Sequence, residues 1–115
     1  MVRTFEEVWL DLEKLKGKTV FTLVHHVKSK VIDVDSRGML RRSERWNQVK
    51  HIDRSAFKRA WEKLAIDGYC RLSDTWKFVC ACLALLPEVE YSLKPGTIWL
   101  SKNRHDFGKP VEKTQ

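Results

Sequence analysis

The fold is decided by the stretch Lys30-Val31-Ile32-Asp33-Val34-Asp35-Ser36-Arg37-Gly38-Met39-Leu40-Arg41-Arg42, two strand-like runs on either side of a turn. At this turn, Asp35 can accept hydrogen bonds from the backbone through its side chain, and Gly38 can take a positive φ. The stretch therefore predicts an antiparallel hairpin. β-Branched and alternating residues continue the pattern before and after it.

Four strands are expected around this turn, at Thr19–Val27, Lys30–Val34, Met39–Arg42 and Asn47–Ile52. The first is apolar on both faces near its start, which is typical of a strand covered by helices. The third and fourth are polar, so we expect them toward an edge of the sheet. Further along the chain, we expect Tyr69–Leu72 to be a link and Thr97–Leu100 a short last strand. Glu88–Leu93 is ambiguous.

Two helices flank the strands and have recognisable start and stop signals. Apolar residues recur with helical spacing over Phe5–Leu15, with Thr4 as the expected N-cap and Gly17 as the stop. Asp53 is the expected N-cap of the second helix, and Gly68 is its stop. The expected buried stripe of the second helix is Phe57, Ala60, Trp61, Leu64 and Ala65.

A third helix is expected to begin at Ser73 or Asp74 and to end before Pro87. Lys77 is the only charged residue over Trp76–Leu86, so this helix is apolar nearly all round. Such a helix has to be buried, either by its own domain or by a second subunit. Trp76–Leu86 is therefore the expected contact surface of a homodimer or of a protein partner, which is one alternative function.

These elements predict one α+β domain over residues 1–100. In it, an antiparallel meander of three to five short strands packs against an N-terminal helix and two further helices. A chain of 115 residues fits one domain, and 43% hydrophobic residues supply enough apolar surface for a core. Residues 101–115 are polar and contain Gly108 and Pro110, so we expect a mobile C-terminal tail.

Cysteine content and apolar runs bear on the cellular compartment. Three Cys are too few for a disulfide framework, and the odd number leaves a thiol unpaired, which fits a reducing compartment. The first residues are acidic and amphipathic, unlike a signal peptide. The longest apolar run, Phe78–Leu86, has nine residues, whereas a membrane span needs about 20. We expect a cytoplasmic protein with no membrane partner.

Residues 37–63 hold almost all of the net positive charge. Nine Lys or Arg side chains and three carboxylates give this segment a charge of +6, out of +7 for the whole chain. A charge this concentrated raises the local concentration of polyanions. Nucleic acid is therefore the expected partner, with DNA preferred to RNA.

The expected nucleic-acid-binding residues are Arg41, Arg42, Arg45, Trp46, Lys50, Arg54, Lys58 and Arg59. The basic side chains would neutralise phosphates, and Trp46 would stack on an unpaired base or act as a wedge, unless it turns inward to the core. Most of these cations are expected to meet where the hairpin enters the second helix, namely Arg45, Lys50, Arg54, Lys58 and one of Arg41 or Arg42. If they scatter instead, the charge is only a solubilising surface.

No cofactor and no metal site are expected. Cys80 and Cys82 are two residues apart on an expected helix, which places them about 200° apart around its axis. Their thiols therefore cannot both coordinate one metal ion. His25 and His26 are adjacent on an expected strand and face opposite ways. Buried small hydrophobic residues are the better interpretation of the cysteines.

A second alternative is a metal-dependent nuclease that uses Asp33, Asp35 and Lys50. A carboxylate on one strand with Gln-x-Lys on the next is a pattern of the restriction-type nucleases. A catalytic metal needs several convergent ligands, however, and Asp35 already has a role in the turn. No nucleophile elbow or other catalytic motif is present, so we do not expect an enzyme.

The stretch His51-Ile52-Asp53-Arg54-Ser55-Ala56-Phe57-Lys58-Arg59-Ala60-Trp61 resembles small accessory domains attached to restriction-type endonucleases. In those domains a strand ends in a small capped segment, which a Phe-x-x-Ala helix follows. The resemblance covers roughly Lys18–Leu86 and implies a role near DNA, but it transfers no functional residue. Because 115 residues leave no room for a nuclease domain, we expect binding only.

Overall fold

The computed structural model describes residues 2–24, 26–72, 77–93, 96–101 and 110–112. Its elements are, in chain order, α1 (Phe5–Glu13), β1 (Thr19–Phe21), β2 (Lys28–Asp35), β3 (Gly38–Ser43), β4 (Gln48–Asp53), α2 (Arg54–Asp67), β5 (Tyr69–Arg71), α3 (Lys77–Leu83), β6 (Val89–Leu93) and β7 (Gly96–Leu100). The strands form two antiparallel sheets, with the orders β1-β2-β3-β4 and β5-β7-β6. The predicted α+β class and the N-terminal helix are confirmed.

The four-stranded sheet is the predicted meander, since its neighbouring strands are consecutive in the chain. At the β2–β3 turn, the Asp35 carboxylate accepts hydrogen bonds from the backbone N–H groups of Arg37 and Gly38, at 2.8 and 3.2 Å. Gly38 has a φ of +152°, and a Cβ at this position would overlap the carbonyl oxygen of Ile52 on β4. The turn therefore depends on glycine for space as well as for conformation.

β1 is shorter than the expected strand Thr19–Val27, because the chain turns after Phe21. The amide of Thr22 donates to the carbonyl of Val27, and the Thr22 carbonyl accepts from His26, both at 3.0 Å. These two bonds close a tight connection to β2. The apolar residues of this connection have the composition of a strand, which explains why the sequence pattern does not reveal the turn.

The three-stranded sheet contains segments that the sequence does not mark as strands. β5, which we expected to be a link, pairs with β7, and Cys70 lies opposite Ile98. β6 lies in the ambiguous region and pairs with the other side of β7. The predicted last strand is confirmed as β7, and it forms the centre of this second sheet.

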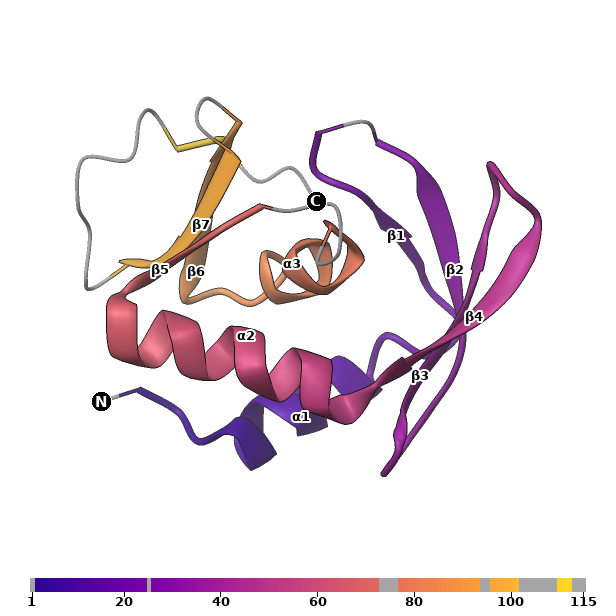
Figure 1. Cartoon of the computed structure of the whole chain (residues 1–115), viewed down its shortest axis with the longest axis horizontal. Helices are drawn as coiled ribbons and strands as arrows, with labels where there is room; N and C mark the ends of the chain where they lie inside the picture. Colours follow the sequence, from indigo (N-terminus) through magenta and orange to yellow (C-terminus); the bar gives the residue numbers. More distant parts are fainter. Residues whose placement is uncertain (1, 25, 73–76, 94–95, 102–109, 113–115) are drawn as a thin grey trace.

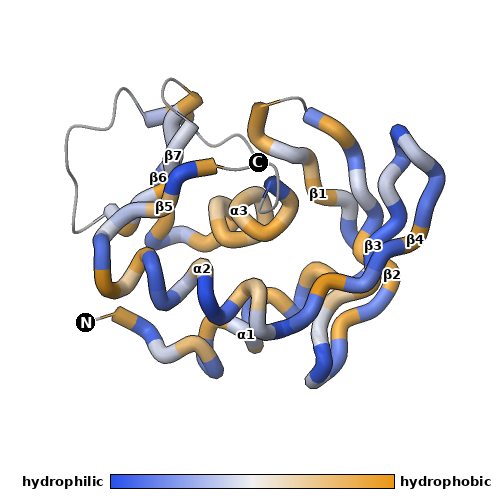
Figure 2. Tube along the Cα trace, in the orientation of Figure 1, coloured by the Kyte–Doolittle hydropathy of each residue, from blue (hydrophilic) through white to orange (hydrophobic). Residues whose placement is uncertain are grey.

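The helices lie between and beneath the two sheets (Figure 1). α3 occupies the space between the sheets, and α2 runs below it, in contact with strands of both sheets and with α1. Figure 2 shows α3 as a hydrophobic segment at the centre of the molecule. The largest fully buried side chains come from both sheets and all three helices, among them Leu12, Met39, Phe57, Leu83 and Trp99.

The ends of α1 and α2 follow the sequence signals except at the end of α1, which stops at Glu13 with Lys14 as its C-cap and so before the expected Gly17. Thr4 and Glu7 form a capping box, in which each side chain accepts a hydrogen bond from the other's backbone N–H. Gly68 ends α2 with a φ of 83°, as predicted. Asp53 stands at the N-cap of α2 but its side chain makes no cap bond there. Its carboxylate instead lies 3.3 Å from Nδ1 of His51.

α3 is buried by the chain itself. Every residue from Phe78 to Ala84 is at most 4% exposed, which confirms the predicted deep burial. The expected cap, Ser73 or Asp74, lies outside the described residues. Phe78–Ala84 are covered by the chain itself, so their burial needs no second subunit, whereas Leu85 just beyond α3 is exposed. A homodimer or protein partner at Trp76–Leu86 therefore stays a prediction, and Trp76 lies outside the described residues.

All three cysteines, Cys70, Cys80 and Cys82, are buried with free thiols. Their interior position is the one that we predicted. Burial raises the pKa of the Cys82 thiol well above its usual range, which keeps it neutral. In the described part of the chain, no three His, Cys, Asp or Glu side chains lie close enough together to hold a metal ion. His25 lies outside the described residues.

The predicted mobile tail falls largely on residues 102–109 and 113–115, which lie outside the described residues. Between these two segments, the backbone N–H of Val111 donates to the carbonyl of Tyr91 on β6, at 2.8 Å. This part of the tail therefore lies along the edge of the second sheet. None of the helices in the described ranges has the length and apolar composition that crossing a bilayer requires.

Candidate nucleic-acid interface

A groove of about 610 Å³ lies between the β3–β4 hairpin on one side and α2 and α3 on the other. Its positively charged lining residues are Arg41, Arg45, Lys50, Arg59 and Lys77. Asp53 is the one carboxylate in the described lining, so these side chains carry a net charge of +4. Cations from the hairpin and from two helices therefore surround one concave space.

Arg41 forms part of the floor of the groove. Its guanidinium carbon lies 4.7 Å from the centre of the Phe78 ring, and Nη1 donates to Oγ of Ser29 at 3.0 Å. Nε is buried and has no hydrogen-bond partner among the described residues. Burial lowers the pKa of Arg41 from its ordinary value, but a guanidinium stays charged at neutral pH. Because Nε is closed to solvent, an anion would approach the rest of the guanidinium, and a half-buried cation with no described carboxylate beside it is suited to receive one.

Lys50 and Arg59 bring exposed charge to opposite walls. Lys50 lies opposite Arg41 in the β3–β4 register, so both side chains share the sheet face that looks toward the helices. Arg59 comes from α2, less than one turn after Ala56, which also lines the groove. Two exposed cations across a concave space can contact successive phosphates of one strand.

Trp46 stands at the rim of the groove, in the four-residue turn between β3 and β4. Asn47 closes this turn with a φ of 50°, and its N–H donates to the carbonyl of Ser43 at 2.7 Å. The Trp46 side chain does not turn inward, because Trp46 is 65% exposed. The guanidinium carbon of Arg45 lies 5.3 Å from its ring centre. The rim thus offers an aromatic face beside a cation.

The groove also contains apolar surface and hydrogen-bonding groups. Ile52, Phe78 and Val79 contribute apolar surface. Gln48 adds a polar side chain that can donate and accept hydrogen bonds. A lining that combines cations, apolar surface and an amide group matches the composition of a nucleotide, which has a charged backbone and a flat, polar-edged base.

Arg54 and Lys58 do not join this groove, contrary to our expectation. The guanidinium of Arg54 lies 4.7 and 5.7 Å from the ring centres of Phe5 and Trp9 on α1. Lys58 is one turn further along the same flank of α2, 4.0 Å from Glu62. Successive helical residues are about 100° apart, so Lys58 and its neighbour Arg59 leave the helix on different flanks.

Ala65 lies on this same flank of α2, and it is exposed although we placed it in the buried stripe. The other four residues of the stripe are buried, as predicted. The stripe is therefore narrower than the sequence pattern indicates, because α1 covers only the first turns of α2 on this side.

Arg42 lies on the other face of the four-stranded sheet. In the register it stands between Lys30 on β2 and Val49 on β4, and adjacent residues of a strand point to opposite faces. Of the two candidates Arg41 and Arg42, the structure therefore brings Arg41 to the groove.

The residues of the nuclease alternative are not brought together. Asp33 lies opposite Leu40 in the register, whereas Lys50 lies opposite Arg41, so their side chains lie on opposite faces of the sheet. Asp33 and Asp35 line a different hollow, of about 370 Å³, and Asp33 lies 3.1 Å from Nζ of Lys16. This geometry gives no support to a shared metal ion.

Among the cations that line the groove, Lys77 is the one that we did not predict as part of the site. It is the first residue of α3, and the fold brings the start of α3 against the hairpin. The signal in the sequence was its position as the single charge in an otherwise apolar segment. A lysine that is the single charge in an apolar segment has to extend its ammonium group toward solvent, and Lys77 does so at the groove.

Comparison of the chain with models of protein families, with curated proteins and with solved structures finds no match. The resemblance to accessory domains of restriction-type endonucleases therefore stays a prediction, and the function rests on the geometry of the groove.

Proposed function

We propose that the protein binds an unpaired stretch of nucleic acid in the groove between the β3–β4 hairpin and the helices. The observation that carries this proposal is the convergence of five cations, from the β3–β4 hairpin and from two helices, around a concave surface with an exposed aromatic ring at its rim. In this arrangement Arg45, Lys50 and Arg59 contact phosphates and Trp46 stacks on a base.

Two features favour an unpaired strand over a duplex. The base faces of a duplex are already stacked on each other, so the exposed face of Trp46 has no partner there unless the duplex is deformed. The apolar and polar groups inside the groove, such as Phe78 and Gln48, fit a base that has left the stack. Phosphate contacts alone would serve both forms equally.

Arg41 would act as the deepest anion contact. Its guanidinium lines the groove and has no described carboxylate beside it, so a phosphate could supply the neutralising negative charge. Contacts of these kinds are independent of base sequence, so we expect affinity with little sequence preference. DNA is the first target to test, and a location in the cytoplasm would fit the three free thiols.

The test is a titration of the protein with labelled single-stranded DNA, single-stranded RNA and duplex DNA, each of about 15 nucleotides per strand, at several salt concentrations. We expect the single strands to bind more tightly than the duplex, with an affinity that falls as salt rises. Absence of binding at low salt, or binding without a salt dependence, contradicts the proposal. Hydrolysis of any strand in the presence of Mg²⁺ would revive the nuclease alternative.

A further inference from the structure

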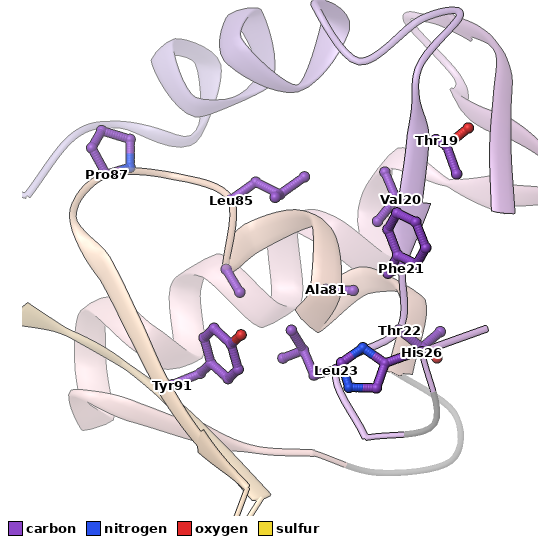
Figure 3. Close-up of a pocket in the computed structure, with 11 residues that line it drawn as sticks. Thr19, Val20, Phe21, Thr22, Leu23, His26, Ala81, Leu85, Pro87 and Tyr91 are labelled. Atoms are coloured by element: carbon purple, nitrogen blue, oxygen red, sulfur yellow. The ribbon is translucent and has the colours of Figure 1, made fainter. Parts of the chain in front are cut away.

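A second hollow, of about 520 Å³, lies between the edge strands of the two sheets. It borders the basic groove at Thr22, which lines both. Figure 3 shows Phe21 on one side and Tyr91 of β6 on the other, with Leu23 and Ala81 of α3 between them. Leu85 forms part of its upper wall in this view. The small side chain of Ala81 leaves the space that larger residues fill elsewhere around α3.

The mouth of this hollow exposes large apolar side chains. Phe21 and Leu85, which line it, are 47% and 56% exposed. Single exposed apolar residues are ordinary on protein surfaces, but exposed apolar residues that share one concavity are typical of a contact surface.

β1 presents an open strand edge beside the hollow. The carbonyl of Lys18 accepts from Val31, and the amide of Thr22 donates to Val27, so these positions pair with β2. In an antiparallel pair the hydrogen-bonding positions alternate, and the peptide groups of Thr19 and Phe21 therefore point away from β2. No strand in the described residues lies on that side of β1.

The edge on the opposite side of the hollow is different. The carbonyl of Tyr91 on β6 accepts a hydrogen bond from Val111, so the chain covers this edge with its own C-terminal segment. The contrast identifies β1 as the edge that has backbone donors and acceptors to offer a partner.

Charge decides which partner fits this edge. Lys18 directly precedes β1, and Lys28 and Lys30 stand opposite Phe21 and Thr19 on β2. All three are exposed, and none forms an ion pair with a described residue. A second copy of this chain that paired through β1 would bring these lysines against their own counterparts. A segment with carboxylates would meet complementary charge.

We propose that β1 and the hollow bind an extended segment of an acidic partner protein. The segment adds a strand along Thr19–Phe21 and places one large apolar side chain in the hollow. Backbone hydrogen bonds supply the register, the hollow selects the apolar residue, and the lysines select the flanking carboxylates. None of the cations that line the basic groove lines this hollow, so the inference does not depend on nucleic-acid binding.

The probe is a set of synthetic peptides of about eight residues, in which a central Leu, Phe or Trp is flanked by Thr, Asp and Glu, the length matching a typical strand. Binding is followed by NMR amide shifts of the full isotope-labelled chain. Thr19→Pro removes one outward N–H at an edge position that tolerates proline, and Leu85→Glu places a charge at the mouth. Ile66→Glu, at an 82% exposed position on α2, is the control.

We expect shifts centred on Thr19–Phe21, a loss of affinity of tenfold or more in both Thr19→Pro and Leu85→Glu, and no change in Ile66→Glu. Peptides flanked by Lys in place of Asp and Glu should bind at least tenfold more weakly. The proposal is wrong if none of the peptides binds, or if Leu85→Glu leaves their affinity unchanged. It is also overturned if a single-stranded oligonucleotide or a second copy of the chain, detected by sedimentation, covers the Thr19–Phe21 amides instead.

Discussion

The guanidinium of Arg41 lies over the ring of Phe78, 4.7 Å from its centre, and so joins the hairpin to the first turn of α3 at the floor of the basic groove. Arg41 and Phe78 are distant in sequence, and the contact exists because the four-stranded sheet wraps around α3. It fixes a cation at a place where the surrounding described residues offer no carboxylate. Arg41 therefore contributes both to the packing of the fold, through Phe78, and to the positive charge of the groove.

Replacing Arg41 with Met should separate these two roles. Met keeps most of the apolar contact with Phe78 and removes a half-buried charge, so the free energy of unfolding should change by less than about 1.5 kcal/mol. Affinity for single-stranded DNA should fall several-fold. Denaturant unfolding and a binding titration measure the two quantities, with Arg42→Met on the opposite face as the matched control. A binding loss in Arg42→Met equal to that in Arg41→Met would contradict the assignment.

Trp46→Ala should weaken the binding of single strands without affecting the fold. Stacking of a base on an aromatic side chain contributes about 1–3 kcal/mol, so we expect a loss of roughly tenfold or more in affinity. Trp46→Phe should keep part of the affinity, because the phenyl ring still stacks. Duplex affinity should change little in either variant. Equal losses for duplex and single strand would show that Trp46 does not contact an unpaired base.

Gly38→Ala should destabilise the hairpin far more than Gly17→Ala does. Both glycines have a positive φ, but a Cβ at Gly38 would also overlap the carbonyl oxygen of Ile52, whereas a Cβ at Gly17 meets nothing within 4 Å. We expect a loss of about 1 kcal/mol for Gly17→Ala from backbone conformation alone, and more than about 2 kcal/mol for Gly38→Ala. Denaturant unfolding measures the loss of stability in each variant. Equal losses in Gly38→Ala and Gly17→Ala would show that the overlap with the Ile52 carbonyl oxygen costs nothing.

Low pH should weaken the ion pairs through which Arg3, in the N-terminal segment, binds Asp11 and Glu88. Arg3 donates hydrogen bonds to Asp11 at 2.7 Å and to Glu88 at 2.6 Å, and the first of these holds the pKa of Asp11 below its ordinary value. A carboxyl with a lowered folded-state pKa stabilises the fold above its unfolded pKa, and this contribution is lost as pH falls through the folded value. The free energy of unfolding should therefore decrease below about pH 4.

In Asp11→Asn, the free energy of unfolding should fall less at acidic pH than it does in the wild type. The difference should be under about 1 kcal/mol, because the ion pair between Arg3 and Asp11 is partly exposed. The measurement is denaturant unfolding of the wild type and the variant between neutral and acidic pH. An unchanged slope in the variant would show that other carboxyl groups govern the acid response.

Local signals predicted the hairpin and most helix ends, because each depends on residues close in sequence. Asp35 and Gly38 define their turn, Thr4 caps α1, and Gly68 ends α2. β5 was missed, since its three residues become a strand only through pairing with the distant Trp99 and its neighbours. Strands this short have too little pattern of their own to be recognised.

The candidate site was predicted in composition but only partly in geometry. The charge cluster identified Arg45, Lys50 and Arg59, which do meet, and Trp46 at the rim. We expected Lys58, and not Arg59, among the cations that meet where the hairpin enters α2. The two residues leave the helix on different flanks, and the sequence does not say which flank faces the hairpin. That choice is made when Arg54 packs against α1, a contact between segments far apart in the chain.

The most direct test of the account compares Arg59→Ala with Lys58→Ala. The two residues are neighbours on α2, both exposed, and each loses one positive charge, but only Arg59 lines the groove. The measurement is the salt dependence of binding to single-stranded DNA. We predict that Arg59→Ala lowers the affinity several-fold and reduces the slope of log K against log salt by about 0.7 to 1, while Lys58→Ala leaves both nearly unchanged. Equal effects of the two variants would mean that net charge, and not the groove, holds the nucleic acid.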